Sequence, residues 1–149
     1  MTPKLTDDER RAIEADCERL IKHYVNLNDA QDWPAVAALY SEDAVFQRPS
    51  GGNPIEGRDA ILASFLARSP RVQRHLMANV VVDVEDADHA RAFSVIVLYQ
   101  GDPAGEGELP AMDPKSPLVG TFTDRLVRTP EGWRFAERVG GLDFAPRFP

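Results

Sequence analysis

The sequence contains a single cysteine, Cys17, and only three histidines, at positions 23, 75 and 89, among its 149 residues. One cysteine cannot form an internal disulfide bond, and it excludes a zinc site built from several cysteines. The histidines do not form an H-x-x-x-H pair, so only a mixed site of histidine and carboxylate ligands stays open. We therefore expect a protein that does not depend on a metal ion.

Long apolar segments, an excess of positive charge and nucleotide-binding motifs are missing as well. No apolar run approaches the length of a membrane span. The N-terminal sequence MTPKLTDDERRAIEADC is charged and lacks the apolar core of a signal peptide, so we expect the protein in the cytoplasm, away from membranes. Its 17 basic and 24 acidic residues give a formal net charge of −7, which argues against binding nucleic acid through a basic surface. The motifs G-x-S-x-G, G-x-G-x-x-G and the P-loop do not occur, and a small-molecule ligand stays open.

The chain has the length and composition of one globular domain, with 43% hydrophobic and 28% charged residues, and we expect residues 1–149 to form a single domain. Helical spacing is clearest near the start. Thr6 and Glu9 have the spacing of a capping box. The apolar residues that follow recur at steps of four and three, which predicts a long N-terminal helix: Ile13, Cys17, Leu20, Tyr24 and Leu27.

Two shorter helices and one short strand are expected next. Asp32 can cap a helix that has Pro34 in its first turn and continues through Leu39 and Tyr40. Residues 44–46 are a strand candidate, 48–57 read as a loop, and a third helix is expected from about 58 to 68.

The second half of the chain changes to the alternating pattern of β-strands. Residues 72–84, 90–100, 118–129 and 132–140 are rich in Val, Phe, Ile and Thr and predict four long strands, with a hairpin turn at 129–132. Residues 101–117 carry four prolines and three glycines, and a loop of this length is usually functional or mobile. Helices first and strands afterwards predict an α+β fold in which helices cover one face of a curved antiparallel sheet.

Three stretches resemble one known family in their order and spacing: NDAQDWPAVAALYSEDAVF (28–46), GRDAI (57–61) and RHLMANVVVDVEDADHARAFSVIVL (74–98). They are similar to the SnoaL-like branch of the NTF2-like superfamily, and the resemblance covers roughly residues 8–140. It implies a cone, in which the sheet wraps around the long N-terminal helix and leaves a deep, mostly apolar pocket. Family enzymes place one or two ionisable groups in that pocket and usually need no cofactor. The same fold hosts dehydratases, isomerases, hydrolases, cyclases, oxygenase subunits and non-catalytic binders.

The resemblance implies a catalytic pair. Asp29 and His75 stand where family lyases, such as gamma-hexachlorocyclohexane dehydrochlorinase, pair an Asp at the helix junction with a His of an R-H-x-x-x-N strand. A neutral imidazole can take a proton near pH 7, and a carboxylate on its other nitrogen fixes the tautomer. The alternative is a helix-capping Asp and a strand His bonded to backbone. A regular helix would also place Asp29 about 140° from Tyr24, so the hypothesis requires an irregular last turn at Asn26 and Asn28.

Further side chains are candidates for acid catalysis or substrate binding. Tyr24 and Arg138 resemble the Tyr and Arg of bile-acid 7α-dehydratase, where Tyr24 would be the acid and Arg138 would hold an anionic or carbonyl group; the alternatives are a core tyrosine and a solvent-facing charge. Arg48 stands where ketosteroid isomerase has its Asp base, which excludes that base and leaves a rim cation or a surface residue.

The last candidates follow from strand positions and composition. On the strand VIVLYQG only Tyr99 or Gln100 offers a further polar group, which weakens a strict dehydratase assignment. Strand alternation places Asn79 on the same side as His75, together with Met77 and Val81. A further set of aromatic residues belongs to the pocket or the core: Trp33, Phe46, Phe93 and Phe122.

We therefore expect a cofactor-free enzyme that acts on a hydrophobic, cyclic or aromatic small molecule. His75, oriented by Asp29, would abstract a proton, and elimination (a dehydratase-type lyase) or isomerisation would follow. The alternatives are a non-catalytic ligand-binding member and the small subunit of a ring-hydroxylating oxygenase. Open sheet faces in this fold normally pair, which implies a homodimer or homotrimer. The loop 101–117 and the aromatic tail GLDFAPRFP (141–149) are candidate lid or interface segments.

Overall fold

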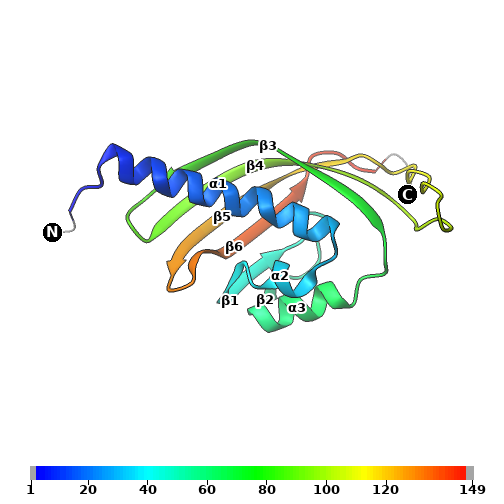
Figure 1. The fold of residues 1–149 in the computed structure, drawn as a ribbon, viewed down its shortest axis with the longest axis horizontal. Helices are drawn as coiled ribbons and strands as arrows, with labels where there is room; N and C mark the ends of the chain where they lie inside the picture. The colour runs from blue at the N-terminus through cyan, green and yellow to red at the C-terminus, as the bar shows by residue number, and fades with distance from the viewer. Residues whose placement is uncertain (1–2, 147–149) are drawn as a thin grey trace.

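One six-stranded sheet forms the frame of the computed structural model, which describes residues 3–146 (Figure 1). Its strands lie in the order β2-β1-β6-β5-β4-β3. The elements along the chain are the helices α1 (Asp7–Asp29), α2 (Trp33–Ala37) and α3 (Arg58–Leu66), and the strands β1 (Tyr40–Gln47), β2 (Ile55–Glu56), β3 (Val72–Val84), β4 (His89–Gly101), β5 (Leu118–Thr129) and β6 (Gly132–Leu142). The α+β fold and the four long strands predicted from the sequence are confirmed.

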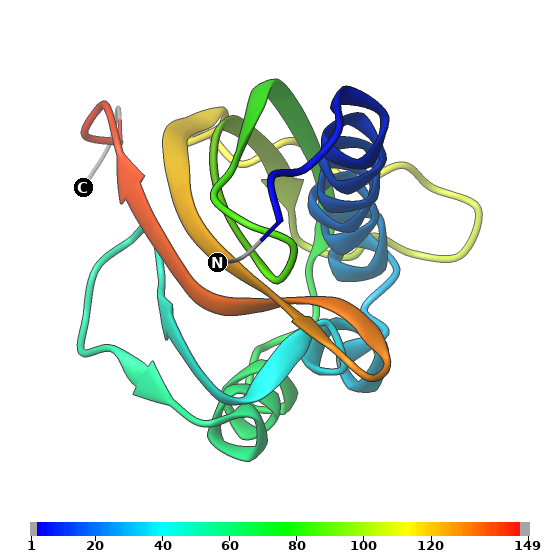
Figure 2. The same cartoon turned by 90° about the vertical axis from the view of Figure 1, so that its left-hand side faces the viewer.

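Helix α1 packs against one face of the curved sheet, chiefly along β3, while α2 and α3 lie beside β1 (Figures 1 and 2). The predicted capping box starts α1: the Glu9 amide donates to Thr6 Oγ1 at 3.1 Å, and the Thr6 amide donates to Glu9 Oε2 at 2.7 Å. The predicted apolar stripe of α1, from Ile13 to Tyr24, is buried in the core between helix and sheet. Asp32 caps α2 by accepting from the Ala35 amide at 3.3 Å.

The edge of the sheet around β1 differs from the prediction. Helix α2 ends at Ala37, and Tyr40, expected in that helix, begins β1 instead. Tyr40 is fully buried opposite Phe135 of β6, so packing overrides the helical spacing. Strand β1 runs parallel to β6 in a sheet that is otherwise antiparallel, and β2 occupies part of the expected loop 48–57.

A bulge in β3 changes which side chains face the helices. The pairing with β4 shifts between Ala78 and Val81, and Asn79 takes a positive φ of 53°. Before the bulge His75 points toward α1; after it the inward positions are Val80, Val82 and Val84. Asn79 is exposed, as is Val81, so the expectation that both share the side of His75 is wrong.

The chain end runs past β6 along the surface. Phe144 of the aromatic tail is 68% exposed, and Phe148 lies outside the described residues. No helix within residues 3–146 is both apolar enough and long enough to cross a membrane.

Candidate active site

A cavity of about 380 Å³ lies between the helices and the sheet. Its apolar wall combines side chains from every layer of the fold: Val25, Trp33, Phe46, Phe65, Ile96 and Phe122. Of the aromatic residues whose place the sequence left open, Trp33, Phe46 and Phe122 line this cavity, whereas Phe93 is 46% exposed on the outer face of the sheet. The dimensions suit a small, mostly apolar ligand.

Asp29 and His75 lie in contact at the wall of this cavity. Asp29 Oδ1 is 2.5 Å from His75 Nδ1, and Asp29 Oδ2 accepts the His75 backbone N–H at 3.0 Å. Both side chains are largely buried, at 5% and 11% exposed, and His75 lines the cavity whereas Asp29 does not. A carboxylate on Nδ1 favours the tautomer that carries its proton there, which leaves Nε2 as an acceptor. The imidazole can therefore accept a proton at Nε2 while Asp29 fixes its orientation through Nδ1.

The helix reaches this geometry without the irregular turn that we expected. Helix α1 is continuous to Asp29, and its cap Ala30 is still in the right-handed helical region. Asn28 keeps the helical path and donates from Nδ2 to the Tyr24 carbonyl at 3.0 Å. Tyr24 and Asp29 do point in different directions, as the helical phase requires: Tyr24 lines the cavity, and Asp29 faces β3. The irregular turn is not required, because Asp29 does not need to reach the cavity itself. It contacts the His75 ring, and this ring lines the cavity.

Tyr24 is buried in the cavity wall, with its hydroxyl 2.7 Å from the hydroxyl of Tyr40. Burial raises the pKa of Tyr24 and raises that of Tyr40 well above its ordinary range. Both phenols therefore stay protonated near neutral pH, and the pair holds a hydroxyl proton at the cavity wall.

Arg138 lies behind the wall, which corrects the expectation of direct contact with a ligand. It has no exposed surface and does not line the cavity. Its guanidinium carbon is 3.9 Å from the ring centroid of Phe122 and 4.4 Å from that of Tyr24, and its Nε is 3.6 Å from Asp124 Oδ1. Burial raises the pKa of Asp124 to about 6, although the Arg138 charge opposes this. Arg138 and Asp124 can therefore affect the cavity only through the aromatic rings of Tyr24 and Phe122.

The remaining candidate residues divide between the cavity and the outer surface. Arg48 and Trp33 line the cavity. Tyr99 pairs with Arg74 across the outer face and is 37% exposed, whereas Gln100, the other polar candidate on that strand, lines the cavity. We expected Tyr99 and Asn79 to contact the substrate, but neither residue lines the cavity.

The comparisons with known proteins agree with this architecture. The sequence profile described as a SnoaL-like domain matches residues 9–139. The chain belongs to the SnoaL-like family. No curated protein matches the sequence significantly.

Solved structures confirm the NTF2-like cone fold for this SnoaL-like domain. A "putative scytalone dehydratase" from Novosphingobium aromaticivorans superposes with a TM-score of 0.79 at 21% identity, over 93% of this chain and 89% of that chain. An NTF2-like protein with a cystatin-like fold from the same species gives 0.69 at 24% identity, over 89% and 83%. A ketosteroid isomerase-like protein from Erwinia carotovora atroseptica gives 0.69 at 20% identity, over 88% and 96%. Such identities establish the shared fold and leave the chemistry to the residues of the site.

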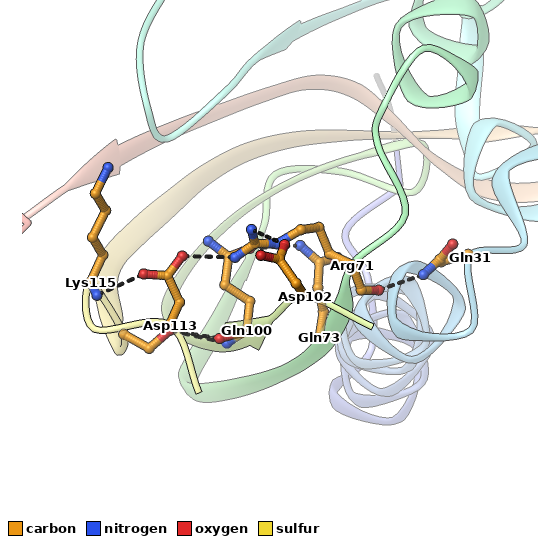
Figure 3. Close-up of polar contacts among 8 residues, drawn as sticks. Gln31, Arg71, Gln73, Gln100, Asp102, Asp113 and Lys115 are labelled. Atoms are coloured by element: carbon orange, nitrogen blue, oxygen red, sulfur yellow. Dashed lines mark hydrogen bonds and ion pairs between the residues drawn. The ribbon is translucent and has the colours of Figure 1, made fainter. Parts of the chain in front are cut away.

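Two arginines of the SnoaL-like domain line the cavity and were not among the predicted site residues. Arg68 follows α3, and Arg71 precedes β3. Arg71 donates to Asp102 and to Asp113, each at 2.8 Å, so it ties the loop 101–117 to the cavity mouth (Figure 3). The only signal in the sequence is the run RSPR at 68–71, which does not reveal the direction of either side chain.

Candidate metal ligands do not cluster in the described part of the chain. Among residues 3–146 no three His, Cys, Asp or Glu side chains lie close enough together to hold an ion. Cys17 is buried, and burial raises the pKa of its thiol to about 12, so it stays protonated.

Proposed function

We propose that this SnoaL-like domain is a cofactor-independent enzyme that removes a proton from a hydrophobic, cyclic or aromatic small molecule, followed by elimination (a dehydratase-type lyase) or isomerisation. The observation that carries the proposal is the contact between Asp29 Oδ1 and His75 Nδ1 at the wall of a largely apolar cavity. A base whose rear nitrogen is held by a carboxylate has the orientation that proton abstraction needs.

In the elimination, His75 Nε2 takes a proton from carbon, and the electrons of that C–H bond form a C=C bond. The Asp29 carboxylate stabilises the imidazolium that results. The C–O bond to the leaving hydroxyl breaks with its electron pair going to oxygen, and Tyr24 transfers its proton to that oxygen, so that the hydroxyl departs as water. Tyr24 regains the proton from the imidazolium, directly or through solvent, and the cycle closes with no net change in the protein. In the isomerisation the same proton returns to another carbon.

The test is hydrogen–deuterium exchange, which detects proton abstraction without knowledge of the natural substrate. The wild-type protein is incubated in D₂O with cyclic apolar carbon acids such as 2-tetralone, and loss of the C–H signal is followed by NMR. We expect catalysed exchange that His75→Gln and Asp29→Asn reduce by about 10² to 10⁴-fold. His23→Gln, on the surface of α1, is the matched control. Undiminished exchange in both site variants would contradict the mechanism and leave a ligand-binding role for the cavity.

We further infer that a second copy of the chain covers the outer face of β3 and β4. Large apolar side chains stand exposed there, away from the cavity: Val72 at 46%, Leu76 at 51%, Val81 at 56% and Phe93 at 46%. Residues Val81 and Phe93 are direct cross-strand partners, so the patch is continuous across the two strands. This face is opposite to the one that His75 and the helices share, so a homo-oligomer built on it would not fill the cavity itself.

A further inference from the structure

The charge of the cavity is opposite to the charge of the whole chain. The protein carries a formal net charge of −7. Among the described residues that line the cavity, however, there are three arginines and no aspartate or glutamate: Arg48, Arg68 and Arg71. A local excess of positive charge inside a largely apolar cavity raises the local concentration of anions and favours a negatively charged ligand group.

Arg71 does not contribute to this excess because its charge is already compensated. Its two terminal nitrogens each lie 2.8 Å from a carboxylate, one of Asp102 and one of Asp113 (Figure 3). Both carboxylates belong to the loop 101–117. Arg71 therefore has a structural partner on the loop and is not available to a ligand in this arrangement.

Arg48 and Arg68 have no such partner within residues 3–146. No carboxylate of that part of the chain lies within 4.0 Å of either guanidinium. Arg48 donates from Nη2 to the Ser64 carbonyl at 3.1 Å, and its Nε is buried without a hydrogen-bond partner. Arg68 lies over the ring of Phe65, with its guanidinium carbon 4.3 Å from the ring centroid. Both side chains are thus held in place, while N–H groups stay available.

The charge of Arg48 also acts on the Arg68 guanidinium. Burial lowers the pKa of Arg68, and the charge of Arg48 lowers it further, since like charges oppose one another across the cavity wall. Two positioned and uncompensated arginines in a partly buried site cost free energy in the empty protein. An oxyanion placed between them would remove that cost and gain charge-assisted hydrogen bonds, which arginine makes in a planar fork.

We propose that Arg48 and Arg68 form an oxyanion subsite, and that the substrate of this SnoaL-like domain is a ring-bearing apolar molecule with a carboxylate held there. The inference rests on the proposed function in placing the substrate in this cavity. Arg48 directly follows β1 and Arg68 lies two residues after the end of α3, whereas His75 comes from β3, at the far edge of the sheet. The anionic group is therefore held by elements other than those that carry Asp29 and His75, and it sets the direction in which the ring enters.

The experiment compares two ligands that share the same ring and nearly the same size, one anionic and one neutral. Binding of 2-naphthoate and of its neutral analogue 2-naphthamide is measured by calorimetry at pH 7. We expect the wild-type protein to bind naphthoate at least about tenfold more tightly. Arg48→Gln and Arg68→Gln should each lower the affinity for naphthoate about tenfold or more and leave that for naphthamide within about twofold. Arg125→Gln, an exposed arginine of β5 outside the cavity, removes the same charge and should change neither.

Further variants and probes separate the outcomes. Arg68→Lys keeps the charge, so it should retain more of the naphthoate preference than Arg68→Gln does. 2-Naphthalenesulfonate and 2-naphthyl phosphate test whether another oxyanion is preferred, and tighter binding of either would overturn the choice of a carboxylate. Equal affinity of the wild-type protein for naphthoate and naphthamide, or binding of neither, overturns the subsite. The subsite is also overturned if the arginine variants lose affinity for naphthoate and for naphthamide to the same extent.

The same measurements distinguish this inference from the proposed reaction. His75→Gln should abolish deuterium exchange and leave the ratio of naphthoate to naphthamide affinities unchanged. If exchange persists in His75→Gln while the arginine variants lose the naphthoate preference, the reaction is wrong and the oxyanion subsite holds. If exchange is lost while the preference does not depend on the arginines, the subsite is wrong and the reaction holds.

Discussion

The Asp29 carboxylate holds His75 twice, through the ring Nδ1 at 2.5 Å and through the backbone N–H at 3.0 Å. One side chain of α1 therefore fixes both the position of β3 and the rotation of the imidazole on it. Both contacts are polar, so a substitution of the same size such as Asp29→Asn changes them without removing apolar packing.

Asp29→Asn is expected to reverse the histidine tautomer. An asparagine amide can donate to Nδ1 where the carboxylate could only accept, which moves the ring proton to Nε2 and removes the free base from the cavity side. ¹⁵N–¹H NMR of the imidazole reports which nitrogen carries the proton. Asp32→Asn, at the cap of α2, is the control because it keeps a capping side chain. An unchanged tautomer in Asp29→Asn would contradict the orienting role of Asp29.

Removal of Arg138 is expected to destabilise the protein strongly, although it touches no ligand. Arg138→Met leaves Asp124 as a fully buried carboxylate without its counter-charge, which costs about 3–5 kcal/mol of unfolding free energy. The double variant Arg138→Met/Asp124→Leu should lose less than Arg138→Met alone, because no unpaired charge remains. Urea unfolding of both variants and of Asp124→Leu measures the coupling. Additive losses would show that the pair does not act as a unit.

The long strands could be predicted because alternation persists over many residues, but two bulges reset it where the site is built. In β3 the bulge at Asn79 turns that side chain away from the side of His75. In β6, Arg125 pairs with Glu137 and the next residue, Leu126, pairs with Phe135, so Ala136 is the extra residue. Phe135 and Arg138 therefore both point inward although three positions apart. Asn79 is of a residue type that tolerates a positive φ, but a single Asn does not locate a bulge, and the residues around Ala136 carry no such signal.

The candidate site was predicted only in part for a similar reason. Asp29 and His75 could be chosen from their place in family-like motifs, 46 residues apart, but not from any local pattern. Arg68 and Arg71 were missed because they lie between α3 and β3, where the path of the connection decides which side chain enters the cavity. The net charge of the whole chain, −7, gave no indication that the residues lining the cavity carry positive charge.

The stability of the wild-type protein should decrease as pH rises through the titration of Asp124. Burial raises the pKa of Asp124 to about 6 in the folded protein, so the unfolded chain loses this proton first as pH increases. The contribution of this group to the unfolding free energy falls by about 3 kcal/mol between roughly pH 4 and pH 6 and is constant above that range. The difference between wild type and Asp124→Asn in urea unfolding isolates this group from others. A difference that does not vary with pH would contradict the raised pKa.

Arg71→Gln is expected to release the loop 101–117 from the cavity mouth. The substitution removes both ion pairs, to Asp102 and to Asp113, which join the loop to the start of β3 (Figure 3). Limited proteolysis with a glutamate-specific protease detects release of the loop, because Glu106 and Glu108 lie within it. We expect faster cleavage there in Arg71→Gln than in wild type or Arg125→Gln. Equal cleavage rates would show that the loop is held by its other contacts, such as the Asp113 amide with the Gln100 carbonyl at 2.7 Å.

A charge on the outer face of the sheet should separate the proposed oligomer. Phe93 is a 46% exposed member of the apolar patch, and its Asp substitution would bury an unpaired carboxylate in any interface formed there. We expect Phe93→Asp to be monomeric by light scattering at concentrations where wild type is oligomeric, with its helical and strand content unchanged by circular dichroism. Phe144→Asp, which changes an exposed phenylalanine of the separate C-terminal tail, is the matched control. If only Phe144→Asp dissociates the oligomer, the interface lies at the tail. If the wild-type protein is a monomer, the inference of an interface on β3 and β4 is wrong.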